Sequence, residues 1–291
     1  MSPRTLRSAV ALALALGSAR ASAQATPLPG CSFPPAALAD VAPGTKGSAP
    51  GGFPRLGGTV YFAADDGTHG VELWTSDGTP GGTRMVRDLN PDSGSARVRG
   101  LTAFQGKAYF IATDGEHGYQ LWTSDGSAAG TRVVRELGSG IEGGNVDDLT
   151  VMGGRLYFSA SDHVLGKELW TSDGTLEGTR MLKDINPGAD SSISTGSLLA
   201  VGARLYFSAY TDDAGFELWT SDGSEAGTRR VKDVFPGPDS ANPEQLTAVG
   251  TTLYFTATNG TRALEVWKSD GTEAGTVPVS DAIGAMKNPY P

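Results

Sequence analysis

The sequence has very few of the residues that bind metals or form disulfides, with one Cys and three His in 291 residues. A single Cys cannot form an intramolecular disulfide, and it excludes the usual zinc site of two Cys and two His. The chain also has no basic surplus, since 32 acidic residues against 23 basic ones give a net charge of -9. Nucleic acid and anionic membrane surfaces are therefore poor candidate partners.

Long apolar runs are also missing, and no segment reaches the roughly 20 apolar residues that a membrane-spanning helix needs. The N-terminus instead has the three parts of a secretory signal: a basic start at Arg4 and Arg7, an apolar run over 9–16, and the small residues 21–23. We predict a signal peptide over 1–23 and a flexible leader over 24–37. The protein is then expected to be secreted, or to lie at the cell surface or in the periplasm.

Cys31 has two interpretations, because residues 28–31 (LPGC) faintly resemble the lipid-attachment box of bacterial lipoproteins. That box should follow the apolar run directly, whereas Cys31 lies 15 residues beyond Leu16. An unpaired thiol in the leader is the favoured interpretation, and a lipid anchor is the alternative.

An internal repeat dominates the rest of the chain. The five Trp are spaced by 48, 48, 49 and 48 residues, and five Tyr repeat the same intervals. Each Trp stands in a phrase such as ELWTSDGT. The chain therefore contains five copies of one unit. The repeated aromatic residues are Trp74, Trp122, Trp170, Trp219 and Trp267, with Tyr61, Tyr109, Tyr157, Tyr206 and Tyr254.

Each unit is predicted to form four short strands, which in the third copy cover 149–152, 155–160, 168–171 and 179–185. The second of these strands is apolar at consecutive positions, so both of its faces should be covered. Asp-Gly pairs are typical of tight turns. A second Gly that recurs four residues later, as at Gly178, is predicted to occupy another left-handed position.

Five four-stranded units of about 48 residues are typical of propeller blades. We therefore predict an all-β fold: a β-propeller of five four-stranded blades in a single domain over 38–291. An incomplete six-bladed ring and a β-solenoid are the alternatives. The predicted blades cover 53–91, 101–139, 149–187, 198–236 and 246–281.

Residues 38–44 (LADVAPG) align with residues 182–188 (LKDINPG), so an extra copy of a fourth-strand segment precedes the first blade. The fourth strand of the last unit contains Pro278, which cannot donate to a strand ladder and belongs at an edge. We predict that 38–44 is a closing strand that docks beside the last blade. The rival interpretation is that 38–44 is a remnant of a longer array.

The phrase ELWTSDGT, followed by Gly-Thr and a Val-Lys-Asp-Ile-like segment, resembles the ELWxxDGT repeat family of secreted bacterial proteins over residues 38–281. Some copies depart from the pattern, as at Gln120, Val266 and Lys268. The resemblance implies export and a propeller-like array, and it carries over no catalytic residues.

The repeated Trp and Asp side chains are the candidate site residues, and a structural role is the favoured interpretation of both. A Trp at the same place in every blade is typical of a core, although a sugar-stacking surface is the alternative. The Asp of each turn is expected to bind nearby backbone amides, with calcium as a low-ranked alternative, because the dense Asp spacing of a calcium loop is missing. These residues are Asp77, Asp125, Asp173, Asp222 and Asp270.

Other charged residues also repeat. His69 and His117 occupy equivalent positions in adjacent copies, which duplication explains more simply than a metal site. A repeated Glu, as at Glu168, and a repeated base, as at Lys183, are expected to form cross-strand ion pairs. No single Ser, His and Asp constellation is visible for nucleophilic catalysis.

The sequence therefore predicts an exported, monomeric and non-catalytic scaffold that binds a macromolecule or a glycan and requires no cofactor. A propeller hydrolase or lyase acting on extracellular polysaccharide is the alternative, with Asp147–Asp148 and Asp212–Asp213 as weak hints of an asymmetric site.

Overall fold

The computed structural model describes residues 38–44, 47–91, 94–193, 196, 198–261 and 264–279. The predicted signal peptide, the leader with Cys31, and residues 280–291 lie outside the described residues. Within the described ranges, no helix is long and apolar enough to cross a membrane.

Twenty strands form five antiparallel four-stranded sheets, each in the order of the chain, and we call these sheets blades 1 to 5. Blade 1 contains β1 (Arg55–Leu56), β2 (Thr59–Asp65), β3 (Val71–Ser76) and β4 (Arg84–Arg87). Blade 2 contains β5 (Arg99–Phe104), β6 (Lys107–Ala112), β7 (Gln120–Ser124) and β8 (Arg132–Val133). Blade 3 contains β9 (Asp147–Met152), β10 (Arg155–Ser161), β11 (Lys167–Ser172) and β12 (Arg180–Lys183). Blade 4 contains β13 (Leu199–Val201), β14 (Arg204–Thr211), β15 (Gly215–Ser221) and β16 (Arg229–Lys232). Blade 5 contains β17 (Glu244–Val249), β18 (Thr252–Ala257), β19 (Glu265–Ser269) and β20 (Val277–Pro278).

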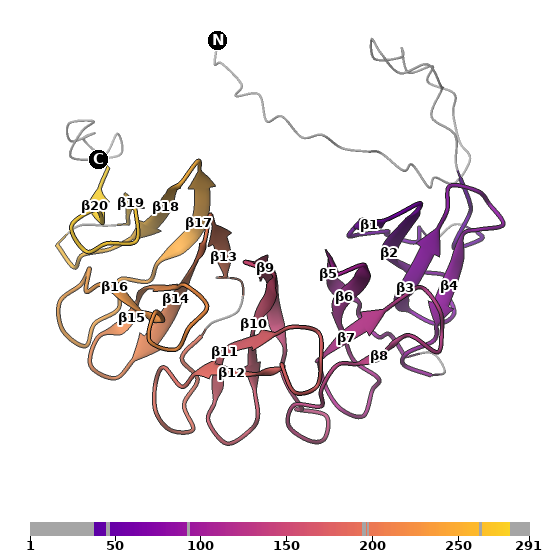
Figure 1. The fold of residues 1–291 in the computed structure, drawn as a ribbon, viewed down its shortest axis with the longest axis horizontal. Coiled ribbons are helices and arrows are strands. Elements are labelled where there is room, and N and C mark those ends of the chain that lie inside the picture. The colour runs from indigo at the N-terminus through magenta and orange to yellow at the C-terminus, as the bar shows by residue number, and fades with distance from the viewer. Residues whose placement is uncertain are drawn as a thin grey trace, which may run out of the picture.

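The blades follow one another around an arc (Figure 1). The first strands, such as β5, β9 and β17, line the inner edge of this arc, and the fourth strands lie toward its outside (Figure 1). The predicted propeller of five four-stranded blades is confirmed. The ring is open, because blades 1 and 5 lie at opposite ends of the arc (Figure 1).

Residues 38–44 do not take the predicted position beside blade 5. They form no strand, and Val41 packs on blade 1 against Phe62, Ala64 and Trp74. This is the contact that Ile185, at the aligned position, makes with the blade that follows it. The docking prediction is therefore wrong in this structure, since the segment covers the first blade and leaves the arc open.

The second strands of blades 2 to 4 are covered on both faces, as their continuous apolar runs predict. In β10, Phe158 packs toward blade 2 in one cluster, with Tyr109 and Leu121. The adjacent Tyr157 packs toward blade 4 in the next cluster, with Phe207. Because successive strand residues point to opposite faces, one strand serves two blade–blade interfaces.

The Ser-Asp-Gly-Thr turn is held by its own side chains. Asp173 Oδ1 accepts hydrogen bonds from the Thr175 amide (2.9 Å) and the Thr175 hydroxyl (2.7 Å), and Thr175 Oγ1 accepts one from the Gly178 amide (2.9 Å). Gly174 has the predicted positive φ, at 89°. The prediction for Gly178 is wrong, because its φ is not in the left-handed region; a Cβ there would collide with the Asp173 carboxylate.

Replacing Trp170 by Ala should lower the free energy of unfolding by about 3–5 kcal/mol, because the large cavity that it leaves lies between two blades. The control is Trp74→Ala at the open end of the arc, where the indole is only half-buried and the cost should be smaller. Urea unfolding measures both. Equal costs for the two variants would contradict the interpretation that the neighbouring blade stabilises each Trp.

Candidate binding site at the inner edge

The repeated Trp side chains belong to the core. Those of blades 2 to 5 are only 4–7% exposed, and each lies in a cluster shared with the preceding blade. In blade 3 the indole of Trp170 stacks on Phe158 with ring centroids 6.5 Å apart. These faces are not available for stacking on a sugar.

The repeated Asp side chains are exposed, but their Oδ1 atoms are used within their own turns. Each accepts bonds from the amide and the hydroxyl of the Thr or Ser two residues later. These donors hold the pKa of each of the five carboxyls below its usual value. Among the described residues, no group of three or more His, Cys, Asp or Glu is arranged to hold a metal ion.

The two equivalent His are also used locally. His69 Nδ1 lies 2.7 Å from Asp66 Oδ2, and His117 Nδ1 lies 2.7 Å from Asp114 Oδ2. The carboxyl partner raises the pKa of each imidazole. Each His therefore binds an Asp of its own turn.

In blade 3 the repeated Glu168 and Lys183 bind partners other than each other, so the predicted cross-strand ion pair is wrong there. Glu168 is fully buried, and its carboxyl accepts bonds from the amides of Ile185 (2.9 Å) and Ser192 (3.1 Å) in the loop that leaves its blade. Lys183 instead donates to the backbone oxygen of Thr228 in the next blade, at 2.8 Å. The Glu anchors a loop, and the base connects two blades.

Two columns of the repeat change from blade to blade in both charge and size. The first column lies at or a few residues before the start of the first strand, and the second lies at or next to the start of the third strand. The first column is Gly51, Arg99, Asp147, Gly196 and Glu244; the second is Val71, Tyr119, Lys167, Phe216 and Leu264. We call these residues the variable columns.

In blades 2 and 3 the variable columns form one charged cluster. Asp147 lies between two bases, with Oδ1 3.7 Å from Arg99 Nε and Oδ2 3.9 Å from Lys167 Nζ. The Arg99 guanidinium lies over the ring of Tyr119 at 3.9 Å, and Arg97 donates to the Tyr119 hydroxyl at 3.3 Å. The cluster thus places one guanidinium group over the ring of Tyr119 and a second one at its hydroxyl.

Asp148, the residue after Asp147, lies next to this cluster. It occupies the left-handed region, with φ 60°, where blade 2 has Gly100 at φ 63°. Its Oδ1 accepts from the Gly196 amide (2.7 Å), and its Oδ2 accepts from the Ser159 hydroxyl (3.2 Å). Burial raises the pKa of Asp148 and lowers that of Lys167. Each oxygen of Asp148 therefore accepts a hydrogen bond from the protein.

The variable columns also line a pocket between blades 4 and 5. This pocket has a volume of about 230 Å³ and is lined by Phe216 and Glu244 of the two columns together with Ser208, Asn242 and Pro243. Ser208 is the repeat equivalent of Ser159, so the pocket occupies the same place in its blades as the charged cluster does in blades 2 and 3. The variable columns therefore form a charged cluster in blades 2 and 3 and line a pocket between blades 4 and 5.

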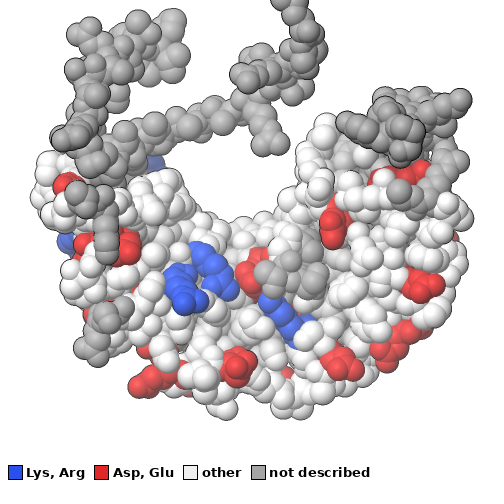
Figure 2. Space-filling model, turned by 180° about the vertical axis from the view of Figure 1, so that it is seen from behind, with Lys and Arg blue, Asp and Glu red and all other residues white. Residues whose placement is uncertain are grey.

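Figure 2 shows one face of the arc, in which basic side chains gather near the middle of the arc and acidic side chains lie along the outer rim and to either side. Asp213, of the Asp212–Asp213 pair that the sequence also indicated, does not belong to the charged cluster around Asp147. Its side chain is largely exposed and lies 3.3 Å from Arg230 on the outer strand β16.

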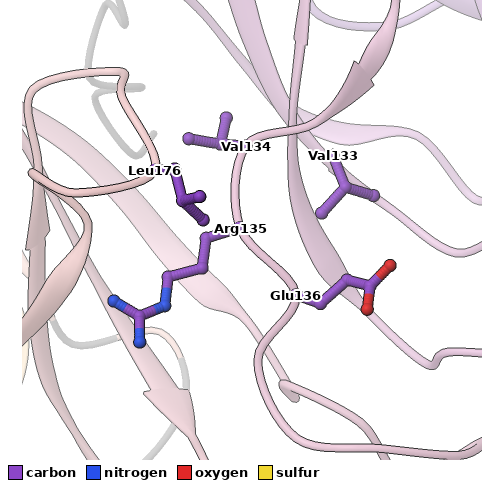
Figure 3. Close-up of a pocket in the computed structure, with 5 residues that line it drawn as sticks. All are labelled: Val133, Val134, Arg135, Glu136 and Leu176. Atoms are coloured by element: carbon purple, nitrogen blue, oxygen red, sulfur yellow. The ribbon is translucent and has the colours of Figure 1, made fainter.

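A second pocket, of about 360 Å³, lies between β8 and the turn of blade 3 (Figure 3). Leu176 and Val134 contribute apolar surface, and the Glu136 carboxylate points away from the Arg135 guanidinium (Figure 3). Arg135 already donates to the backbone oxygen of Thr179 at 2.6 Å. This pocket therefore joins two blades and presents no pair of reactive groups.

No family model matches the chain, and no curated protein matches it. Among solved structures, the chain is similar to a puromycin hydrolase mutant complexed with PGG, with 17% identity, 79% of this chain and 38% of that chain covered, and a TM-score of 0.50. It is also similar to TolB from Acinetobacter baumannii, with 13% identity, coverage of 74% and 50%, and a TM-score of 0.42.

A third similar structure is a puromycin-hydrolyzing peptidase of Mycobacterium tuberculosis, with 13% identity, coverage of 81% and 37%, and a TM-score of 0.49. The chain spans less than two fifths of the length of the two hydrolases. At 17% identity the likeness to the puromycin hydrolase mutant shows the fold alone, which is that of a β-propeller. Membership of the ELWxxDGT family stays a prediction.

The buried Glu side chains predict an unusual pH dependence. Burial raises the pKa of Glu72, Glu168 and Glu217 to about 7, from 4.5 for an ordinary Glu. In the folded state these carboxyls hold protons at pH values where the unfolded chain has lost them. The free energy of unfolding should therefore fall as pH rises from about 4.5 to about 7.

Glu168→Gln should flatten this fall, because the amide does not titrate, and Gln120 already stands at the equivalent buried position in blade 2. Exposed Glu225→Gln is the control and should leave the slope unchanged. Urea unfolding across the same pH window measures the slopes. An unchanged slope in Glu168→Gln would contradict the assignment.

Proposed function

We propose that this protein is an exported, non-catalytic propeller scaffold that binds an extracellular glycan along the inner edge of the arc. The observation that supports the proposal most directly is the position of the variable columns. The packing residues repeat in every blade, whereas the residues of the variable columns differ in charge and size, and those of blades 2 and 3 form the charged cluster. In repeat proteins, such differing positions on a constant scaffold are where binding specificity is built.

The chemistry of the charged cluster in blades 2 and 3 favours an acidic polysaccharide. Arg97 is exposed, and Arg99 keeps about a third of its side chain exposed (36%) beside Tyr119. Guanidinium groups bind carboxylates with two parallel hydrogen bonds. The Asp147 carboxylate lies between Arg99 and Lys167, so its negative charge is largely compensated.

The non-catalytic part of the proposal rests on the resemblance to the ELWxxDGT repeats, which carries over no catalytic residues. A glycosidase needs two carboxyl groups in unlike environments that can reach the scissile bond. Asp147, between two bases, and the buried Asp148 do lie in unlike environments, so hydrolysis is tested separately. Export is supported by the three-part N-terminal signal.

The test is isothermal titration with polygalacturonate, using neutral dextran as the comparison probe. Arg97→Ala/Arg99→Ala should weaken polygalacturonate binding about tenfold or more, because each lost charged hydrogen bond is worth roughly 1.5–3 kcal/mol. The control is Arg132→Ala/Arg180→Ala, which removes two exposed bases that donate only to their own neighbouring residues.

Equal binding by both double variants would refute the location of the site, and equal binding of dextran would refute the carboxylate chemistry. An assay for new reducing ends on the same polysaccharide tests the non-catalytic part. Steady release of such ends, lost in Asp148→Asn, would favour the hydrolase alternative.

A further inference from the structure

The four interfaces between neighbouring blades are built from the same two surfaces. The forward face of one blade contributes the Tyr of its second strand, the Leu of ELW and an aliphatic residue of its fourth strand. The backward face of the next blade contributes Phe and Trp. The forward triplets are Tyr61, Leu73 and Val86; Tyr109, Leu121 and Val134; Tyr157, Leu169 and Leu182; and Tyr206, Leu218 and Val231.

Among the residues that the structure describes, no further blade covers the forward face of blade 5. Its Val266 stands where Leu218 is fully buried in blade 4, yet Val266 is 47% exposed. Val249 is 62% exposed, whereas Val201 at the equivalent position of blade 4 is 7% exposed. Tyr254 is only half-buried. The residues of this face are apolar, as at the other four interfaces, but they meet water.

Blade 1 has the complementary backward face, and it is only partly covered. Val41 packs on Phe62 and Ala64, but the cluster there is much smaller than the four internal ones. Trp74 remains half-buried, and Phe53, stacked on Phe62 at 6.1 Å, is 42% exposed.

The turn of blade 1 shows the same unfilled contact. In blades 2 to 5 a Cβ placed on the Gly of the Asp-Gly turn would meet the Tyr hydroxyl of the preceding blade, as at Gly126 with Tyr61. At Gly78, in blade 1, the same construction meets nothing within 4 Å. The place that a forward-face Tyr would fill is open.

We propose that these two faces bind each other between copies of this chain, so that the forward face of blade 5 in one molecule packs on the backward face of blade 1 in another. The four internal interfaces show that the two surfaces fit, and Figure 1 shows that the two faces of a single molecule lie at opposite ends of the arc. Since the two faces differ, the contact is head-to-tail, which produces a closed ring of copies or a filament.

This proposal departs from the monomer that the sequence led us to expect, and it does not depend on the glycan site. Exposed apolar surface of this extent usually marks an interaction site.

The experiment is sedimentation analysis of the purified protein over a range of concentrations, with reductant present to exclude a disulfide at Cys31. The wild-type protein should gain mass as its concentration rises. Val266→Arg, which spoils only the forward face, and Phe53→Arg, which spoils only the backward face, should each stay at the mass of one copy. Val164→Arg, at an exposed loop position of blade 3, is the control and should behave as wild type.

An equimolar mixture of Val266→Arg and Phe53→Arg decides the geometry. Each variant keeps one intact face, so the mixture should form a species with the mass of two copies and nothing larger. Thermal melting of each dilute variant checks that it is folded. A wild-type protein that stays at the mass of one copy at every concentration would overturn the proposal, as would a mixture in which folded variants do not associate.

Discussion

The contact on which the structure depends is the packing of Tyr, Leu and an aliphatic residue of one blade against Phe and Trp of the next. A four-stranded sheet of this size cannot bury both of its faces alone, and its second strand is apolar on both sides. Each blade is therefore stabilised by packing against its neighbours. The other repeated features support this contact: the buried Glu ties down the loop between two blades, and the base of the fourth strand binds a backbone oxygen of the following blade. The abundant Gly serves the same end, since Gly178 is required where the chain passes the Asp173 carboxylate.

A scaffold held in this way leaves some positions free to vary. At the starts of the first and third strands the repeat accepts different residues, although Val71 and Tyr119 also pack against the clusters between blades. That freedom explains why Arg99, Asp147 and Glu244 can occupy one repeat column with charges of different sign. The curvature of the arc then brings Arg99 and Asp147 of neighbouring blades within 3.7 Å of each other, although they are 48 residues apart.

The repeat made much of the fold predictable, because the Trp and Tyr intervals set the number of blades and the continuous apolar run of β10 required a cover on each side. Contacts between the repeat units of the chain were harder to infer from the sequence. The pattern placed Glu168 and Lys183 on neighbouring strands, but it did not show that one binds the loop amides and the other the next blade. It also did not show that residues 38–44 stay on blade 1, because an alignment gives the kind of segment and not its partner. The variable columns were visible in principle as positions where aligned copies disagree, and Asp147–Asp148 was the one part of the cluster that the sequence indicated.

If packing by the next blade stabilises each blade, then backbone amides in the middle blades should be better protected from hydrogen exchange than the equivalent amides of blade 5. Measured on dilute protein, the amides of the central strands β6, β10 and β14 should exchange most slowly, and the equivalent amides of β18 in blade 5 should exchange through easier local opening. Equal protection in all five blades would contradict the account, because it would mean that each blade is stable without a neighbour on its forward face.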